Sequence, residues 1–487
     1  MKLKLLLLLL PCALFATAKT VTIKGHINGK LRKTLYYTAP VNGVSGFDFS
    51  NTTRPDATGN FEVKVNLEYV AFIDFYYSYN FAGCIVAQPG EAYTLDITEK
   101  EGGISYVVAG KEAEGQKLYT NLMAGKNRIT LMVELAYEAL KLDNAKMQQA
   151  DFKKREDTDV AALKKLLDTK AISRGFYDAA ISERHYFYTA SASYAICLRL
   201  SHAEYDEAVK NDPSFKASWP KVFEANPPAD TALQQSPWGV IYLDCYKYYT
   251  LYKQAGYDTQ KLGEPNPDPL ADIKANETII PALHAEYFTA AKLHMEAAEN
   301  AKDKNLIDKF GYFKKRYPGS PYTAYLEPEI APVIAFYAEN NSLPANAAYV
   351  ENYSGINTLE DIVKKFPGKK LYFDVWATWC GYCREEFKYK EELYKLLKAN
   401  DITVIYVSFD TDDADEKWRK MITFYGLQGY HIRANKELDS HLSHIFSGTA
   451  SIALPWYFLV NSKGELAVKY AAPPSDITKL EADIKKL

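Results

Sequence analysis

Long apolar runs are scarce in this chain of 487 residues. A membrane-spanning helix needs about 20 consecutive apolar residues, and no stretch beyond the N-terminus approaches that length. The N-terminal stretch is shorter: it carries Lys2 and Lys4, then a run of leucines, and it ends in Ala16-Thr17-Ala18. This is the pattern of a secretory signal peptide. We therefore expect residues 1–18 to be cleaved and the mature protein to be exported without stable membrane insertion.

One cysteine in this leader leaves a second outcome open. Cys12 could carry a lipid, as in a lipoprotein, but Pro11 directly before it is a poor residue at a lipid-linked cleavage site. We therefore prefer cleavage after Ala18 to lipid anchoring at Cys12.

Neither sign of charge is in large excess. The chain has 58 Lys and Arg against 61 Asp and Glu, a formal charge of −3, and loss of the leader lysines makes it slightly more acidic. Nucleic-acid-binding domains carry basic patches, so we expect no nucleic-acid partner. Apolar residues make up 47% of the chain, enough for sizeable cores, and the length favours about three domains.

Cysteine and histidine are also few, with six and eight residues. Histidines in the middle of the chain lack the spacing of a metal site and are expected to be structural: His185, His202, His284 and His294. Outside the leader and one close pair, the cysteines are Cys84, Cys197 and Cys245, each in apolar, aromatic company. This setting favours buried free thiols, although a Cys197–Cys245 disulfide stays open in an oxidising compartment.

The close pair lies in Trp379-Cys380-Gly381-Tyr382-Cys383-Arg384. The apolar run Lys370–Trp376 before it predicts a buried strand. Behind it, apolar residues recur at roughly helical spacing: Phe387, Leu393, Tyr394, Leu396 and Leu397. A strand, a short turn with CxxC and a helix form the layout of a thiol–disulfide centre.

The chemistry follows from that layout. A free thiol has a pKa of about 8.5, and the thiolate is the nucleophile. The N-terminus of a helix favours an anion, so we expect Cys380 to be the exposed, attacking cysteine and Cys383 to resolve the mixed disulfide. Asp374 lies on the predicted strand beneath the pair and could accept the Cys383 proton, because an apolar strand raises a carboxyl pKa. The alternative is an ordinary strand acid with satisfied hydrogen bonds.

Residues 373–383 resemble the active-site segment of thioredoxin-fold proteins, and the sequence after them is similar to secreted thioredoxin-like reductases of the TlpA type. The resemblance covers residues 348–487. It implies that residues 452–460 carry the cis-proline, Pro455, that faces the motif; a plain edge-strand proline is the alternative. It also implies substrate contacts at Trp379, Gly381, Tyr382, Leu454 and Pro455.

The same resemblance implies a location and partners. The protein would work in the periplasm of a bacterial cell envelope, without a cofactor. Its substrate would be an exported protein with a disulfide, and a membrane-bound donor would supply the electrons.

Two departures from the family pattern matter. Tyr382 replaces the proline of thioredoxin, so the motif reads CGYC, as in a bacterial periplasmic disulfide isomerase. We expect net reduction, with isomerisation or oxidation as the alternative. The following helix lacks the proline that often kinks it, so we expect it to run straighter.

Other uses of the two cysteines fit less well. Zinc also binds CxxC, and His441 and His444 could complete a C2H2 set. However, these histidines fall on a predicted helix with Leu442 and Ile445, and Trp379 after an apolar strand suits a redox turn, so we expect no metal. A purely structural disulfide is disfavoured because so small a ring is strained.

The rest of the chain divides into three parts. Residues 19–110 contain short strands separated by turns, which predicts a β-sandwich-like domain. This domain resembles the β-domain that often precedes secreted thioredoxin-like domains, and a binding or docking role is the one function we expect of it.

Residues 111–346 predict an α-helical domain. Its tyrosine-rich stretch, residues 238–252, favours core packing over a ligand-stacking surface, and residues 262–269 predict an exposed loop. A further alternative is therefore a non-enzymatic binding or assembly factor that uses this domain. Residues 343–354 are the expected linker into a thioredoxin-like α/β domain, residues 347–487.

Overall fold

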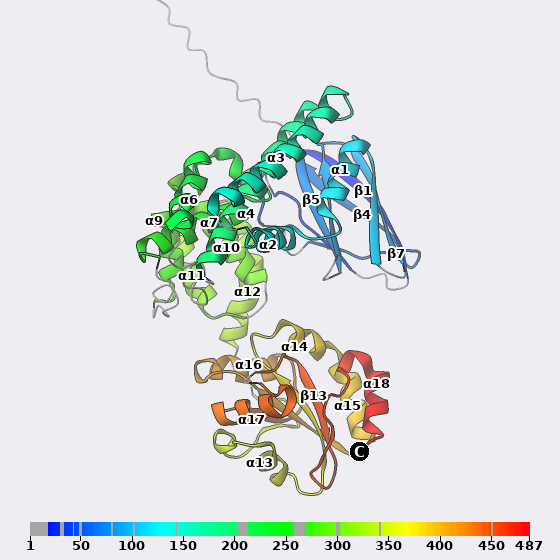
Figure 1. Ribbon diagram of the computed structural model, residues 1–487. Helices are drawn as coiled ribbons and strands as arrows, with labels where there is room; N and C mark the ends of the chain where they lie inside the picture. Colours follow the sequence, from blue (N-terminus) through cyan, green and yellow to red (C-terminus); the bar gives the residue numbers. More distant parts are fainter. Residues whose placement is uncertain are drawn as a thin grey trace, which may run out of the picture. The chain divides into compact units, whose positions relative to one another are not determined.

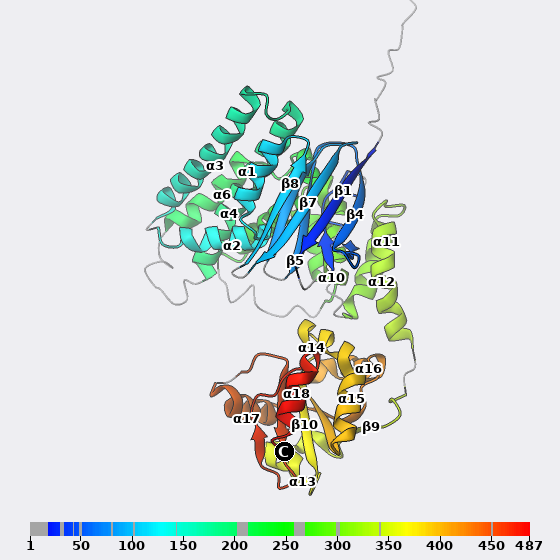
Figure 2. The same cartoon turned by 90° about the vertical axis from the view of Figure 1, so that its right-hand side faces the viewer.

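The computed structural model describes residues 18–29, 34–41, 43–47, 51–78, 81–100, 103–142, 144–201, 213–257, 268–298, 302–339, 342–449 and 451–487. The expected signal peptide with Cys12, His202 and most of the 262–269 loop lie outside these residues. The chain divides into two compact units (Figures 1 and 2). The first comprises Met1–Ala298 and Asp308–Glu327, and the second Glu299–Ile307 and Pro328–Leu487.

The first unit begins with two four-stranded sheets, ordered β4-β1-β7-β8 and β3-β2-β5-β6. Alternating side chains from both sheets share one hydrophobic cluster, among them Ile23 and Phe61 from the first sheet and Ile73 and Phe75 from the second. The predicted N-terminal strands are confirmed, and the sandwich description stays a prediction. The strands are β1 (Lys19–Asn28), β2 (Leu35–Tyr37), β3 (Thr52–Thr53), β4 (Asn60–Leu67), β5 (Ala71–Ser78), β6 (Phe81–Ala87), β7 (Ala92–Lys100) and β8 (Gly103–Gly110).

Helices follow the strands, which confirms the predicted helical middle region. They are α1 (Ala113–Met123), α2 (Arg128–Ala139), α3 (Ala145–Asp168), α4 (Arg174–Ser201), α6 (Pro213–Ala225), η2 (Thr231–Gln235), α7 (Gly239–Gln254), α9 (Ala271–Ile279), α10 (Ala282–Ala298), α11 (Asn305–Arg316) and α12 (Thr323–Ala338). Tyr119 of α1 and Phe176 of α4 pack on Phe72 and Val86 of the second sheet. In Figure 1, α2 lies between the strands and the helices α7 and α10, whereas α1 lies against the strands.

The tyrosines of α7 largely support the core-packing interpretation. Tyr242, Tyr249 and Tyr252 are buried, and Tyr249 stacks on Phe223 with ring centroids 5.1 Å apart. Tyr248, by contrast, is 53% exposed.

The second unit contains a six-stranded sheet ordered β14-β13-β10-β11-β12-β9. Its strands are β9 (Ala347–Tyr349), β10 (Lys370–Trp376), β11 (Ile402–Ser408), β12 (Gly429–Arg433), β13 (Trp456–Val460) and β14 (Leu466–Val468). The expected linker thus contributes an edge strand, because Ala347 pairs in parallel with Gly429. In β10, every residue after Lys370 is buried, as in a strand covered on both faces.

Helices cover both faces of this sheet. They are α13 (Leu359–Lys364), α14 (Gly381–Glu386), α15 (Lys390–Ala399), α16 (Asp415–Phe424), α17 (Lys436–Ser447) and α18 (Ile477–Ile484), with short 3₁₀ turns η3 (Tyr353–Gly355), η4 (Phe387–Tyr389), η5 (Asp412–Ala414) and η6 (Pro474–Asp476). Tyr372 and Trp376 of β10 join the cluster of α15, α16 and α18. Phe373 and Val375 join that of α13 and α17. This layered α/β arrangement agrees with the expected thioredoxin-like domain.

The expectation of a straight helix after the motif is wrong. The 3₁₀ turn η4 separates α14 from α15. Phe387 and Leu393 both face the core, yet six residues of α-helix would place them about 120° apart around the axis. Three 3₁₀ steps add about 60° of rotation and bring the two side chains closer to one face.

Cys84, Cys197 and Cys245 are free thiols. Burial raises the pKa of all three, in Cys197 to about 11. The Cys197–Cys245 disulfide that the sequence left open is therefore not formed in this structure. Among the described helices, none combines the length and the apolar character needed to cross a bilayer.

Candidate active site

Cys380 is the N-cap residue of α14, immediately before its first helical residue. Its Sγ accepts a hydrogen bond from the backbone N–H of Cys383 at 3.1 Å and is joined to the Cys383 Sγ in a disulfide. The Cys380 sulfur therefore lies where unpaired N–H groups and the helix dipole favour negative charge.

The surroundings of the pair are partly exposed and partly buried. Trp379 is 62% and Tyr382 61% exposed, whereas Cys380 is only 4% exposed and Cys383 is fully buried. Gly381 is exposed. The expectation of an exposed Cys380 is thus wrong for the disulfide form, in which bonding to the buried Cys383 holds its sulfur inward. Cys380 is still the more exposed residue of the two.

A buried acid that sequence reasoning missed positions the turn before the motif. Asp410 is 4% exposed. It accepts hydrogen bonds from the Thr378 backbone N–H (2.9 and 3.1 Å) and hydroxyl (2.7 Å), and also from the Ser408 hydroxyl. The Arg384 guanidinium in turn donates to the Thr378 carbonyl at 2.9 Å. Because β10 and β11 are parallel, their carboxyl ends meet here, and an acid just after the second predicted strand is the signal that could have identified Asp410.

Asp374 lies inside the domain beneath the motif, 1% exposed. Side chains alternate along a strand, so Asp374 lies on the same face of β10 as Tyr372 and Trp376, which share a cluster with both cysteines. Burial raises its pKa well above the ordinary value, and Glu386 adds to the shift. Its Oδ1 has no hydrogen-bond partner among the described residues. This setting favours the protonated form of the carboxyl group.

Glu386, at the end of α14, is a second acid that sequence reasoning missed. Its carboxylate accepts hydrogen bonds from the Ser475 backbone N–H at 2.9 Å and from the Ser475 hydroxyl at 2.8 Å. These bonds hold a negative charge close enough to raise the pKa of Asp374. The one sequence signal for Glu386 is its position, three residues after the second cysteine of the motif.

The peptide bond between Leu454 and Pro455 is cis, and both residues are half-buried. They directly precede β13, whose Trp456 pairs with Val375 of β10 in an antiparallel register. The start of β13 therefore lies beside the end of β10, and Leu454-Pro455 lies at the same edge of the sheet as the CxxC turn.

The histidines of the zinc alternative belong to α17. Leu442, between them, packs with Phe373 on one face of the sheet, and the cysteines pack on the other. His441 instead lies 3.4 Å from the Glu360 carboxylate. In the described part of the chain, no group of three or more His, Cys, Asp or Glu could hold a metal ion.

Known proteins resemble the C-terminal part of the chain. The redoxin family model matches residues 340–485. The thiol-disulfide oxidoreductase ResA of Bacillus thuringiensis subsp. konkukian is 26% identical over 125 residues, which cover 26% of this chain and 67% of the relative. A ResA of Bacillus cereus is 30% identical over 108 residues, 22% of this chain and 57% of the relative.

The protein is a thioredoxin-like oxidoreductase. The enzyme class and the fold expected for its C-terminal domain are confirmed. Solved structures of similar proteins include a thiol:disulfide interchange protein from Bacteroides sp., 22% identical with a TM-score of 0.21, covering 24% of this chain and 74% of that chain. Another, from Chlorobium tepidum, is 17% identical with a TM-score of 0.22 and covers 30% of this chain and 99% of that chain.

Proposed function

We propose that this oxidoreductase exchanges thiols and disulfides through Cys380 and Cys383 and reduces disulfides in exported proteins. The observation that carries the proposal is the Cys380–Cys383 disulfide at the N-cap of α14. Two exposed aromatic residues, Trp379 and Tyr382, flank it. The names of the ResA relatives agree with this chemistry.

The reaction starts from the dithiol. The Cys380 thiolate attacks one sulfur of the substrate disulfide, forms a mixed disulfide and releases the other substrate sulfur as a thiolate, which takes a proton from water. Asp374, whose raised pKa favours the protonated form at rest, gives its proton to the hydroxide that the departing thiolate leaves in the water. Its carboxylate then takes the proton of Cys383, whose sulfur attacks the Cys380 sulfur, so that the second substrate sulfur leaves as a thiolate. Two electrons have then moved to the substrate, and the enzyme holds the Cys380–Cys383 disulfide.

The substrate lies, in this proposal, across the edge formed by the CxxC turn and Leu454-Pro455. An extended segment would add to the backbone just before Pro455, while Trp379, Gly381, Tyr382 and Leu454 contact its side chains. A membrane-bound donor would return two electrons to the disulfide. The expected signal peptide supports export to the periplasm.

The test is Cys383→Ala in the full chain, expressed in its native cell envelope. Without the resolving thiol, the mixed disulfide on Cys380 should persist and appear as adducts on a non-reducing gel, to be identified by mass spectrometry. The Cys380→Ser/Cys383→Ala variant is the matched control and should yield none. Equal trapping by both variants, or none by either, would refute the role of Cys380.

The direction of exchange depends on the reduction potential. Dithiol potentials run from about −270 mV in thioredoxin to about −120 mV in a strong oxidant. We expect a value near the thioredoxin end when the protein is equilibrated with glutathione buffers. A reduction potential near the oxidising end would instead support the alternative function suggested by Tyr382 in the CGYC motif, that of a disulfide isomerase or oxidant.

A further inference from the structure

The first unit contains a partly open cavity of about 800 Å³, whose lining includes neither Cys380 nor Cys383. It lies between the second sheet, which contributes residues of β2 and β5, and helices α2, α7 and α10. A volume of this size is typical of sites for small molecules.

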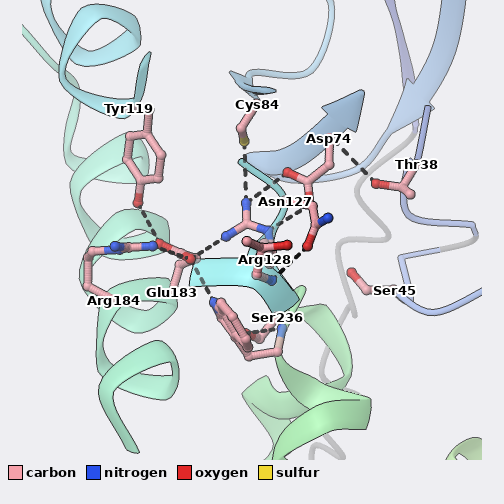
Figure 3. A network of polar contacts seen from close by, with 12 residues as sticks. Thr38, Ser45, Asp74, Cys84, Tyr119, Asn127, Arg128, Glu183, Arg184 and Ser236 are labelled. Atoms are coloured by element: carbon pink, nitrogen blue, oxygen red, sulfur yellow. Dashed lines mark hydrogen bonds and ion pairs between the residues drawn. The ribbon is translucent and has the colours of Figure 1, made fainter. Parts of the chain in front are cut away.

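The floor of the cavity is polar and fixed. Arg128 and Asp74, both nine-tenths buried or more, form a two-point ion pair with N–O distances of 2.6 and 2.9 Å. Figure 3 shows the Arg128 guanidinium between Asp74 and Glu183, which is in turn bound by Arg184. Arg128 also lies over the rings of Phe72 and Trp238, at 5.2 and 5.9 Å.

Each charged side chain of this lining has an oppositely charged partner. Burial alone would raise the pKa of Glu183, but the guanidiniums of Arg184 and Arg128 bring it down to about 2. Behind the lining, Glu183 thus connects Arg128 to Arg184, which also lies 3.7 Å from the Asp159 carboxylate. The third charged side chain of the lining, Lys126, pairs with Glu134 at 2.6 Å.

The walls are mostly aromatic and aliphatic. Tyr36, Tyr37, Phe72, Tyr76 and Tyr287 contribute rings, and Ile129, Val240 and Ile241 are among the aliphatic residues. Tyrosine combines a large apolar face with a hydroxyl, which suits contact with flat organic molecules. Neutral hydrogen-bonding groups, including Thr38, Ser45 and Ser236, complete the lining (Figure 3).

We propose that this cavity binds a small, uncharged, largely apolar aromatic molecule whose single polar group meets the floor beside Asp74. A charged ligand would lack a counter-charge, because each charged lining residue already has one, and an unpaired charge in a buried site is costly. A carboxylate accepts about four hydrogen bonds. Arg128 donates two to Asp74 and the Cys84 thiol a third, so an uncharged donor on the ligand can add one more.

The same ion pairs also connect β5, α2 and α4, which is a structural role. That role does not require a large tyrosine-lined volume beside them. A binding measurement therefore separates the two roles, and it is independent of the proposed redox function because it does not use enzyme activity.

The experiment uses a matched pair of fluorescent probes on the full chain: N-phenyl-1-naphthylamine, which is uncharged, and its sulfonated counterpart 8-anilino-1-naphthalenesulfonate. We expect saturable one-to-one binding of the uncharged probe. We expect the anionic probe to bind about tenfold more weakly or worse. Equal or tighter binding of the anionic probe, or absence of saturable binding, would overturn the proposal.

The location of binding is tested with Tyr36→Ala and Tyr248→Ala. Both tyrosines are about half exposed, at 51% and 53%, but only Tyr36 lines the cavity. We expect Tyr36→Ala to weaken binding of the uncharged probe about fivefold and Tyr248→Ala to leave it unchanged. Equal effects of the two substitutions would contradict binding in this cavity.

A substitution at Asp74 tests whether charge determines which ligand the cavity prefers. Asp74→Asn removes one negative charge from the floor, so the preference for the uncharged over the anionic probe should shrink or reverse. An unchanged preference in a folded variant would refute the charge-balance argument. If Asp74→Asn does not fold, the probe comparison and the Tyr36 variant still decide the proposal.

Discussion

Two buried carboxyl groups show how surroundings decide protonation at the scale of a residue. Glu183 contacts two guanidiniums and stays ionised, with a pKa of about 2. Asp374 is equally buried but has no cation beside it, and burial with nearby Glu386 raises its pKa well above the ordinary value. The first carboxylate stabilises a network of ion pairs, whereas the surroundings of the second favour its protonated form.

Asp374→Asn should change how stability depends on pH. The unfolded chain ionises this aspartate near pH 4, while the folded chain keeps the proton, so unfolding releases one. Wild-type stability should therefore fall by about 1.4 kcal/mol per pH unit above about pH 4 until the folded group also ionises. Asparagine resembles the protonated acid and removes this slope.

The measurement is urea unfolding of the oxidised chain from pH 5 to 8, followed by tryptophan fluorescence. The variant should gain stability over the wild type as pH rises. The same variant should slow disulfide exchange by about 100-fold. Equal pH slopes in the two proteins would contradict a buried, protonated Asp374.

His431 makes the opposite pH prediction. It is buried, donates from Nε2 to the Leu427 carbonyl at 3.1 Å and stacks on Tyr406. Burial lowers its pKa from 6.5 to about 4, so the unfolded chain takes up a proton that the folded chain does not. Stability should fall by about 3 kcal/mol between pH 6.5 and 4.

Substitution isolates this effect. His431→Gln keeps an N–H donor and should lose the acid destabilisation, whereas the exposed His444 can be changed to Gln without altering it. Unfolding curves at pH 7 and 4.5 for both variants provide the comparison. An unchanged slope in His431→Gln would show that the histidine is not buried and neutral.

At the scale of elements, the site depends on where two parallel strands end. Asp410, after β11, holds Thr378, after β10, through three hydrogen bonds. Asp410→Ala leaves the buried Thr378 N–H without a partner, at a cost of about 1–3 kcal/mol. It should also slow disulfide exchange, because the CxxC turn loses its support.

Thermal unfolding and insulin-disulfide reduction test this prediction, with the exposed Asp413→Ala as the control that should change neither. If Asp410→Ala lowers stability but leaves exchange at the wild-type rate, Asp410 supports only the fold.

Local sequence predicted the elements whose burial is continuous or strictly alternating. The six buried residues at the end of β10, the CxxC turn and the buried Asp374 could all be predicted from local sequence.

The turn η4, the strand β9 and the contacts of Asp410 could not be predicted from local sequence. Each depends on a partner distant in sequence: the aromatic packing of Phe387 against Tyr425, the pairing of Ala347 with Gly429 and the bonds to Thr378.

At the scale of the whole molecule, the Cys380–Cys383 disulfide and the cavity lie in different compact units. The cavity was beyond sequence reasoning because its lining comes from strands and helices spread from Tyr36 to Met295. The binding role that the sequence predicts for the N-terminal domain stays a prediction, and the cavity lining combines residues of strands and helices.

The state of the five cysteines from Cys84 onward tests the pairing of cysteines in this structure. The oxidised mature protein, unfolded without reductant, should show three free thiols, Cys84, Cys197 and Cys245, and two more after reduction of Cys380–Cys383. Thiol titration with mass-spectrometric mapping gives the count. A single free thiol would mean that Cys197 and Cys245 pair after all.

The most direct test of the central claim is the pH titration of the Cys380 thiol in the reduced full chain. Thiolate absorbance near 240 nm is followed against pH, and the Cys380→Ser curve is subtracted to remove the other cysteines. A sulfur at the N-cap of α14 should ionise at least about one pH unit below the 8.5 of a free thiol. A midpoint at or above 8.5 would contradict Cys380 as the nucleophile of this oxidoreductase.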